Sequence, residues 1–249
     1  MIMTPNNQKP GIILAAGLGT RMRNLPCQSR PKPLTVVCGI SLLIRTIRSL
    51  KLAGCHEIVI VLGYQAEELE KEIISRYKGE VRLKFAVNEK YELQNGVSVL
   101  CSRPFVDGEF ILTMADHVFD EDIMYLVRHH KPPDNGATLC VDYKLDSIYD
   151  MDDATKVLEK GGHIQTIGKS ITNYNCIDTG IFIGTKGLMD AISEVYHQNG
   201  DVSLSEGVQL LAQRGKMKVL DIKNAFWQDV DTPEMMTHAE ILLKKHNKI

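Results

Sequence analysis

Short apolar runs alternate with amphipathic stretches along the first part of the chain. The run 58–62, Ile-Val-Ile-Val-Leu, is continuously apolar and ends at Gly63, which is typical of a strand buried on both faces of a parallel sheet. In the stretch 42–52, apolar residues return at a helical spacing instead. The same two patterns predict strands at 12–16, 81–87, 110–114 and 137–141, and helices at 66–77, 97–101 and 123–130. This alternation predicts βαβ units on a mostly parallel sheet.

The pattern changes near residue 143. Two short strand patterns, 154–158 and 163–167, flank Gly161-Gly162 and predict a β-hairpin. They are followed by an expected strand at 178–183, helices at 186–198 and 203–214, a strand at 217–222 and a final helix at 233–245. We therefore expect a single domain over 1–249, with an α/β portion at about 11–142, a β-rich portion at about 143–232 and a C-terminal helix in 233–249.

Composition narrows the classes of partner. The formal net charge of the 249-residue chain is -2, so nothing attracts it generally to nucleic acid or an anionic membrane. Its six cysteines show no C-x-x-C pair and no zinc spacing, which favours reduced core thiols in a cytoplasmic protein. The polar N-terminus does not resemble a signal peptide, and no apolar run approaches the roughly 20 residues of a membrane span. A site for a polyanionic ligand must therefore be built locally.

A glycine loop with basic residues follows the first predicted strand. In the loop 17–21, Gly-Leu-Gly-Thr-Arg, the glycines let backbone N–H groups approach a ligand closely, as in loops that cradle phosphate oxygens. Arg21 and Lys32 add positive charge, and the prolines on both sides of Lys32 restrict its backbone. A bare Gly-x-Gly also fits an ordinary strand-to-helix turn. Met22 occupies the third glycine position of a dinucleotide fingerprint, which excludes that motif.

The Met-Ala-Asp-His segment, residues 114–117, ends a strongly apolar predicted strand. Ligands bind at this end of the strands in open α/β sheets, and a carboxylate there suits Mg²⁺, which takes one or two carboxylates plus phosphate oxygens. Asp116 is therefore a candidate metal ligand, with a helix cap or turn as its structural alternative. Nothing in the surrounding sequence demands a role for His117.

A second acidic segment lies near the C-terminus. Asp229 and Asp231 alternate on an extended stretch, so they point to opposite sides and only one is expected to face a metal. We favour Asp231. Asp231 or Thr232 can also cap a helix that begins at Pro233, which is compatible with metal binding.

Three further polar residues are candidates with strong structural alternatives. Ser203 and Glu206 form a capping-box pattern, which explains Glu206 without a ligand. Lys156 and Lys169 lie on or beside the predicted hairpin and would reach a phosphate if the hairpin covers the site; otherwise they are solvated lysines. Gly168-Lys169-Ser170 looks like the end of a P-loop, but His163 stands where that motif requires glycine.

Residues 14–21, Leu-Ala-Ala-Gly-Leu-Gly-Thr-Arg, together with Pro-Lys-Pro-Leu at 31–34, resemble the signature of the sugar-phosphate nucleotidyltransferase superfamily. The resemblance runs from Gly11 to about Glu240. It implies a Rossmann-like mixed, mostly parallel sheet flanked by helices, with a nucleotide-binding portion at about 11–142 and a β-rich, acceptor-side insertion at about 143–232. The implied nucleotide contacts are Leu14, Ala15, Ala16, Gly17, Leu18, Gly19, Thr20, Gln94, Asn95, Gly96 and Ala115. At 94–96, where the base is expected, a simple helix-start turn is the alternative.

Within this superfamily the chain is most similar to CTP:inositol-1-phosphate cytidylyltransferases. The likeness lies in segments 114–118, 152–157, 167–169, 177–180, 204–206 and 226–233. It implies transfer of CMP from CTP to inositol 1-phosphate, giving CDP-inositol and pyrophosphate. It also implies Mg²⁺ on Asp116 and Asp231, and catalytic charge stabilisation by Arg21, Lys32 and Lys169. The implied acceptor contacts are Asp116, Lys156, Lys169, Asp178 and Glu206.

Several alternatives stay open. Archaeal members carry this domain fused to a membrane-embedded transferase; since this chain contains no such segment, we expect a stand-alone enzyme acting on CTP and a small phosphorylated acceptor. Phosphocholine or an aminoalkylphosphonate are alternative acceptors on the same scaffold, and a hexose 1-phosphate with another nucleotide is a further one. A non-catalytic nucleotide-sensing subunit is disfavoured by the joint presence of Arg21, Lys32, Asp116 and Asp231. The sequence leaves the oligomeric state open, including a homodimer.

Overall fold

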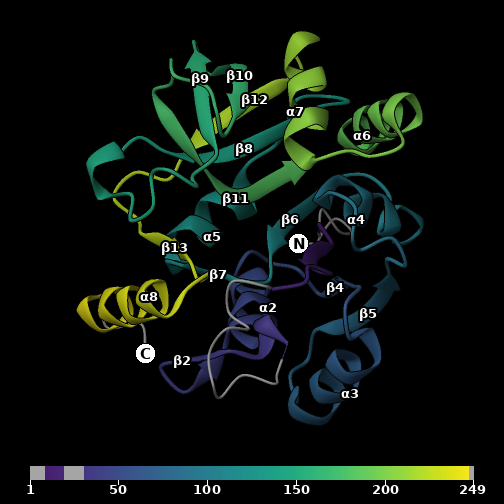
Figure 1. Cartoon of the computed structure of the whole chain (residues 1–249), viewed down its shortest axis with the longest axis vertical. Coiled ribbons are helices and arrows are strands. Elements are labelled where there is room, and N and C mark those ends of the chain that lie inside the picture. The colour runs from purple at the N-terminus through teal and green to yellow at the C-terminus, as the bar shows by residue number, and fades with distance from the viewer. Residues whose placement is uncertain (1–8, 20–30, 247–249) are drawn as a thin grey trace, which may run out of the picture.

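The structure is a computed structural model that describes residues 9–19 and 31–246 (Figure 1). Thr20 and Arg21, which the sequence assigns to the nucleotide site, lie outside the described residues, as does Met22. A nine-stranded sheet forms the centre of the molecule, in the order β5-β4-β1-β6-β11-β8-β12-β10-β9. The predicted mixed α/β architecture is confirmed.

The N-terminal half of the sheet is parallel. Strand β1 (Gly11–Ala15) lies between β4 (Glu57–Leu62) and β6 (Phe110–Met114), and β5 (Arg82–Val87) forms the edge. All five residues of β1 are buried, as expected for a strand covered on both faces. Because these strands run in one direction, their carboxyl ends meet at one edge, where the glycine loop and Asp116 begin.

The C-terminal half is mixed and continues the same sheet. Strand β11 (Cys176–Gly184) runs antiparallel to β6 and β8 (Ala137–Asp142), and β12 (Met217–Asp221) pairs with β8 in parallel. The predicted hairpin is confirmed as β9 (Lys156–Lys160) and β10 (His163–Gly168), joined by Gly161-Gly162. The β-rich part is therefore an extension of the central sheet, because β9 also pairs with β11 and β10 with β12.

Strand β11 changes neighbour along its length. On one side, Cys176 and Ile177 pair with β9, whereas Phe182 to Gly184 pair with β6. Between these two pairings its register with β8 shifts, and Gly180 takes a positive φ of 75°. Such a bulge re-aims side chains and interrupts pairing. Residues 178–181 thus face the point at which β6 ends.

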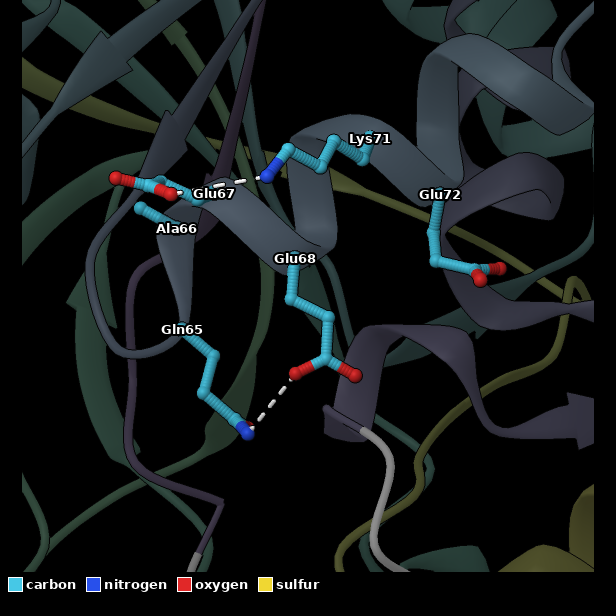
Figure 2. Close-up of a pocket in the computed structure, with 6 residues that line it drawn as sticks. All are labelled: Gln65, Ala66, Glu67, Glu68, Lys71 and Glu72. Carbon is cyan, nitrogen blue, oxygen red and sulfur yellow. Dashed lines mark hydrogen bonds and ion pairs between the residues drawn. The ribbon is translucent and has the colours of Figure 1, made fainter.

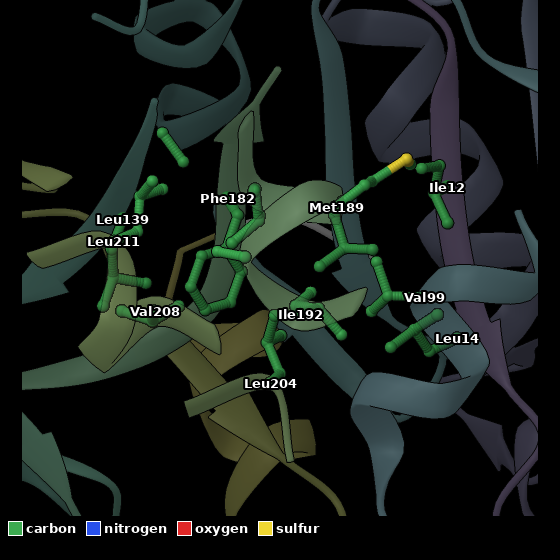
Figure 3. Close-up of a cluster of buried hydrophobic side chains, with 14 of the residues drawn as sticks. Ile12, Leu14, Val99, Leu139, Phe182, Met189, Ile192, Leu204, Val208 and Leu211 are labelled. Carbon is green, nitrogen blue, oxygen red and sulfur yellow. The ribbon is translucent and has the colours of Figure 1, made fainter. Parts of the chain in front are cut away.

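Helices cover both faces of the sheet because alternate strand residues point to opposite sides. Ile12 and Leu14 belong to one hydrophobic cluster, and Ile13 and Ala15 belong to the other. The first cluster packs under α4 (Asn95–Cys101), α6 (Lys186–Asn199) and α7 (Leu204–Gln213), and Figure 3 shows Leu14, Val99 and Ile192 within it. The second packs under α2 (Leu42–Leu52), α3 (Ala66–Arg76) and α5 (Glu121–His129).

Several short elements were not predicted, since two or three residues carry no periodicity. They are the 3₁₀ turns η1 (Lys32–Leu34), η2 (Arg103–Phe105) and η3 (Leu145–Ser147), and strands β2 (Val36–Val37), β3 (Ile40–Ser41), β7 (His117–Phe119) and β13 (Trp227–Asp229). The final helix α8 (Pro233–Lys245) begins and ends as predicted. No helix in the described part of the chain is both long and apolar enough to cross a membrane.

Candidate active site

Three charged side chains from distant segments meet beyond the carboxyl end of β6. The ammonium group of Lys32 lies 2.6 Å from Asp116 Oδ2 and is also bonded to Asp231 Oδ1. Only 11% of the Lys32 side chain, 28% of Asp116 and 11% of Asp231 are exposed. We call Lys32, Asp116 and Asp231 the charge centre.

Two main-chain connections hold the carboxylates of the charge centre together. The N–H of Ala115 donates to the Leu14 carbonyl at 3.0 Å, which extends the β1–β6 pairing up to Asp116. Strands β7 and β13 then pair antiparallel, and the Val230 N–H donates to the Asp116 carbonyl at 2.9 Å. This pairing brings the C-terminal acidic segment beside the end of β6.

The electrostatics of the charge centre favour ionised carboxylates. Burial alone would raise the pKa of Asp116, but Lys32 and His117 outweigh it and hold that pKa well below its ordinary range. His117 Nδ1 donates to Asp116 Oδ1 at 2.7 Å. Burial opposes protonation of His117, yet Asp116 and, more weakly, Asp229 raise its pKa above the usual value. Asp116 is therefore an anion between the Lys32 ammonium and the His117 ring.

The start of α8 shows which residue caps this helix, Asp231 or Thr232. Thr232 is the N-cap, and its hydroxyl accepts from the Met235 N–H at 3.3 Å. The Asp231 carboxylate is consequently left for Lys32. Asp229, as expected from the extended segment, has a different environment, because its Oδ1 accepts from the Gln228 side-chain amide at 2.9 Å.

The glycine loop packs directly against Lys32. Gly19 has a positive φ of 61°, and a Cβ at this position would lie 2.9 Å from Lys32 Cβ. Glycine is thus required both by the backbone conformation and by the close approach. Segment 14–19, which the sequence assigns to nucleotide phosphates, therefore borders the lysine of the charge centre.

A cavity of about 520 Å³ is lined by the start of α4, the end of β10 and the first turns of α7. We call it the polar cavity; its lining consists mainly of amides and hydroxyls, from Gln94, Asn95, Thr155, Ile167, Gly168, Lys169, Ser203, Ser205, Glu206 and Gln209. It brings together residues predicted for the base (Gln94, Asn95) and for the acceptor (Lys169, Glu206). Gly96 serves packing, because its N–H donates to the Val202 carbonyl at 3.0 Å and a Cβ would lie 2.6 Å from that oxygen.

Asp178 connects the polar cavity to the charge centre. Its backbone N–H donates to the carbonyl of Thr155, a cavity residue, at 2.9 Å, and its Oδ1 accepts from the Gly180 N–H at 2.7 Å. A Cβ on Gly180 would lie 2.9 Å from His117 Nε2, so this bulge touches the histidine that binds Asp116. Burial raises the pKa of Asp178 to about 6, despite the Gly180 N–H and His117.

Lys156 and Lys169, the two lysines predicted to contact the acceptor, both bind to other groups of the protein. Lys169 Nζ lies 2.5 Å from Asp153 Oδ1, and 59% of its side chain is exposed. Lys156 Nζ donates to the carbonyls of Lys169 and Ala154 at 3.0 and 3.3 Å. Lys169 lines the polar cavity, whereas Lys156 supports the turn that carries it. Glu206 completes the predicted capping box with Ser203 and lines the cavity as well.

The sequence alone did not identify the residues that position the His117 ring, which are Trp227 and Asp142. The ring stacks on Trp227 with centroids 5.9 Å apart, and the Trp227 indole N–H donates to the buried carboxylate of Asp142 at 3.0 Å. The sequence signal for this support is the Trp-Gln-Asp-Val-Asp segment, which places the single tryptophan of the chain next to the candidate metal ligand Asp231. The register of β7 with β13 was needed to connect it to His117.

Another cavity, of about 620 Å³, lies along the first turns of α3 (Figure 2). Its lining includes Glu67, Glu68 and Glu72, and Glu67 pairs with Lys71 one helical turn later at 3.7 Å. Three carboxylates repel a phosphate. The charge centre and the polar cavity are therefore the candidate site for an anionic substrate.

The charge centre fits a divalent metal that completes its shell with substrate oxygens. Two carboxylates converge on one cation, the Lys32 ammonium, which marks where positive charge is stabilised. Among residues 9–19 and 31–246, no cluster of three or more His, Cys, Asp or Glu has the arrangement of a metal site. Mg²⁺ typically uses one or two carboxylates plus phosphates and water, so two protein ligands suffice.

Comparison with known proteins supplies the family. A family model described as nucleotidyl transferase matches residues 10–245. The chain belongs to the nucleotidyl transferase family. Members of this family generally use a divalent metal, in agreement with the paired carboxylates.

The relatives of this nucleotidyltransferase include long, two-function proteins. It is 36% identical over 238 residues to a protein of Thermococcus kodakarensis named bifunctional IPC transferase and DIPP synthase, covering 93% of this chain and 50% of that one. A protein of the same name from Aquifex aeolicus is 31% identical over 234 residues, covering 94% and 51%. The chain thus spans about half the length of the curated relatives it matches.

A solved structure also resembles this nucleotidyltransferase along its whole length. The inositol-1-phosphate CTP transferase from T. maritima superposes with a TM-score of 0.85 at 28% identity, covering 96% of each chain. The two chains therefore share the sheet and the helices on both of its faces.

Proposed function

We propose that this chain transfers CMP from CTP to inositol 1-phosphate, giving CDP-inositol and pyrophosphate, with Mg²⁺ as the metal. The observation that carries the proposal is the convergence of Asp116 and Asp231 on one cation beside the glycine loop. The names of its relatives, an IPC transferase and an inositol-1-phosphate CTP transferase, support the choice of substrates.

The proposed reaction needs no general base. A phosphate oxygen of the acceptor attacks the α-phosphorus of CTP in line; the new O–P bond forms while the bond to the β-phosphate oxygen breaks, and pyrophosphate leaves with those electrons. Because the attacking oxygen is already an anion, catalysis consists of positioning and charge neutralisation. A bound Mg²⁺ would neutralise charge on the reacting phosphates.

The residues divide this work between them. Asp116 and Asp231 would hold the metal, and the N–H groups of the glycine loop would bind the phosphates that become pyrophosphate. Lys32, whose stem contacts Gly19, would share that charge with Arg21. Lys169 at the polar cavity would steady the attacking phosphate, with Lys156 fixing the turn from which it extends.

The polar cavity suits a neutral polyol. Its described lining offers amides, hydroxyls, Glu206 and one lysine, and it includes no aromatic side chain. A quaternary ammonium group is usually recognised by aromatic faces, so phosphocholine fits this lining poorly. Several hydroxyls of inositol, by contrast, would find donors and acceptors there, and the backbone of Asp178, bonded to the cavity residue Thr155, would bring its carboxylate toward the acceptor. The base would then lie near Gln94 and Asn95, at the start of α4.

A pyrophosphate-release panel tests the proposal. CTP, UTP, GTP and dTTP are each combined with inositol 1-phosphate, phosphocholine, 2-aminoethylphosphonate or glucose 1-phosphate. We expect the highest kcat/KM for CTP with inositol 1-phosphate, with loss of turnover in EDTA and recovery with MgCl₂. A higher value for another pair would replace the proposed substrates, and CTP binding without turnover of any acceptor would favour a nucleotide-sensing role.

A further inference from the structure

Lys32 occupies the position between the two candidate metal ligands. Its ammonium bonds to one oxygen of Asp116 and one of Asp231, residues 84 and 199 positions away in sequence. All three side chains are largely buried. An ammonium and a divalent cation compete for the same carboxylate lone pairs, so Lys32 and a metal cannot both hold these two oxygens.

The pair of carboxylates needs a cation in every state of the enzyme. Two carboxylates close enough to share one ammonium repel one another strongly where little water reaches them, and leaving a buried charge without compensation is costly. In the absence of metal, the Lys32 ammonium supplies the positive charge.

Lys32 also has a second anionic partner within reach. Its Cβ packs against Gly19, whose loop is the proposed phosphate cradle. The backbone of Lys32 is fixed between two prolines in η1, whereas its side chain has a flexible four-carbon stem. The ammonium can therefore move from the carboxylates to a phosphate while its backbone stays in place.

The geometry points to Lys32 as a placeholder cation that holds Asp116 and Asp231 together in the nucleotide-free enzyme and frees them for a divalent metal when nucleotide phosphates attract its ammonium. This role rests on the proposed function for the assignment of the two carboxylates to a metal. It makes metal and nucleotide binding mutually reinforcing, since each removes the other's competitor. Lys32 thereby couples the arrival of the nucleotide to the completion of the metal site.

The test compares two binding measurements on Lys32→Met. Mn²⁺ binding without nucleotide is followed by loss of the free-ion electron paramagnetic resonance signal, and CTP binding in EDTA is followed by calorimetry. We expect the variant to bind Mn²⁺ about tenfold more tightly than wild type, and CTP about tenfold more weakly. A merely structural ion pair predicts a different result, because its loss would weaken both. Unchanged or weaker Mn²⁺ binding by the folded variant overturns the inference.

Lys9→Met is the matched control. Lys9 is as buried as Lys32, with 10% of its side chain exposed, and it pairs with Glu109 at 3.5 Å before the start of β1, at the other end of that strand. Both affinities should match wild type in this variant. A change in Mn²⁺ affinity of the same size as in Lys32→Met would overturn the inference.

A second variant keeps the test decisive if Lys32→Met does not fold in metal-free buffer. The inference expects 10 mM MgCl₂ to restore folding, because the metal replaces the missing ammonium, and expects Lys32→Met/Asp231→Asn to fold without metal. Folding of the double variant together with failure of MgCl₂ to rescue the single variant overturns the inference. The outcome is separable from the proposed function: another nucleotide or acceptor in the pyrophosphate panel leaves the Mn²⁺ measurement unaffected.

Discussion

The charge centre and the polar cavity, which the segment from Asp178 to Gly180 connects, differ in how charge is arranged. In the charge centre, the single ammonium of Lys32 pairs with the two carboxylates of Asp116 and Asp231, and all three side chains are largely buried. In the polar cavity, most groups are neutral amides and hydroxyls, and the two charged ones are tied to the chain, Lys169 to Asp153 and Glu206 to Ser203.

This difference indicates that the charge centre serves the transfer reaction, whereas the polar cavity selects the acceptor. A buried cluster of charge suits phosphates and a metal, which every nucleotidyl transfer involves, whatever the acceptor. A cavity lined by neutral groups distinguishes acceptors by the positions of their hydroxyls. Changes at the charge centre should therefore lower kcat for all acceptors, while changes at the polar cavity should act mainly on the KM of the acceptor.

The largest effect is expected at Asp116. Asp116→Asn keeps the shape of the side chain and leaves Lys32 paired with Asp231, so the fold should persist. Weakening the metal site removes positive charge from the reacting phosphates, and losing one such electrostatic contribution commonly costs about 3–4 kcal/mol, so kcat should fall about 10²–10³-fold for every acceptor. Steady-state kinetics and circular dichroism measure the two outcomes. Asp229→Asn, at an acidic residue bonded to Gln228, is the matched control and should stay within a few-fold of wild type. Equal losses in both variants would place both carboxylates at the metal.

Lys169→Met should have the next largest effect, confined to the acceptor. A hydrogen bond from a charged donor is worth about 1.5–3 kcal/mol, so kcat/KM for the acceptor should fall about 10–100-fold while the KM for CTP stays unchanged. Lys160→Met, at an exposed lysine at the end of β9, controls for charge on the same hairpin. A rise in the KM for CTP in Lys169→Met would move this lysine to the nucleotide side and weaken the contrast between the two regions.

Asp178→Asn should make the protein more stable at neutral pH while weakening its binding of the acceptor. Burial raises the pKa of Asp178 from 3.8 to about 6, so between these values the folded protein binds more protons than the unfolded chain. Its contribution to stability therefore falls as pH rises from about 4 to 6 and stays low above that range. The asparagine variant, whose Oδ1 still accepts from Gly180, should gain about 1–3 kcal/mol at pH 7.5 and nothing at pH 4.

Urea unfolding at the two pH values measures this gain, and acceptor kinetics measure its cost. Because a neutral amide binds hydroxyls less strongly than a carboxylate does, we expect the KM for the acceptor to rise about fivefold. A variant that is no more stable at pH 7.5 would show that Asp178 is well solvated. An unchanged KM would remove Asp178 from the acceptor site.

The smallest effect is expected at Glu206, where cap and ligand contact are separable. Glu206→Gln preserves the capping box, because glutamine at this position can also accept from the Ser203 N–H, so the midpoint of unfolding should stay unchanged. If the carboxylate touches the acceptor, the KM rises about threefold. Ser203→Ala removes the cap itself and should cost about 1 kcal/mol of unfolding free energy. Unchanged kinetics in Glu206→Gln would leave this residue with its structural role alone.

Long, regular patterns and short local motifs in the sequence are enough to predict several elements and several candidate site residues. The apolar run at 58–62 and the helical spacing at 42–52 predict β4 and α2 because burial imposes their periodicity. Asp116 was identifiable because a buried strand ends just before it, and the Ser203–Glu206 cap because its spacing is local. Each of these features depends on residues within a few positions of one another.

The contacts of Lys32, by contrast, follow from tertiary structure. The sequence predicted a fixed positive charge near phosphate, but not that its ammonium would hold two carboxylates. That contact depends on the pairing of β7 with β13, two three-residue strands too short to show a period. The bulge at Gly180 likewise depends on the register of β11 against three neighbours. Short strands and bulges are fixed by the packing of distant segments, so their consequences for the site appear only in three dimensions.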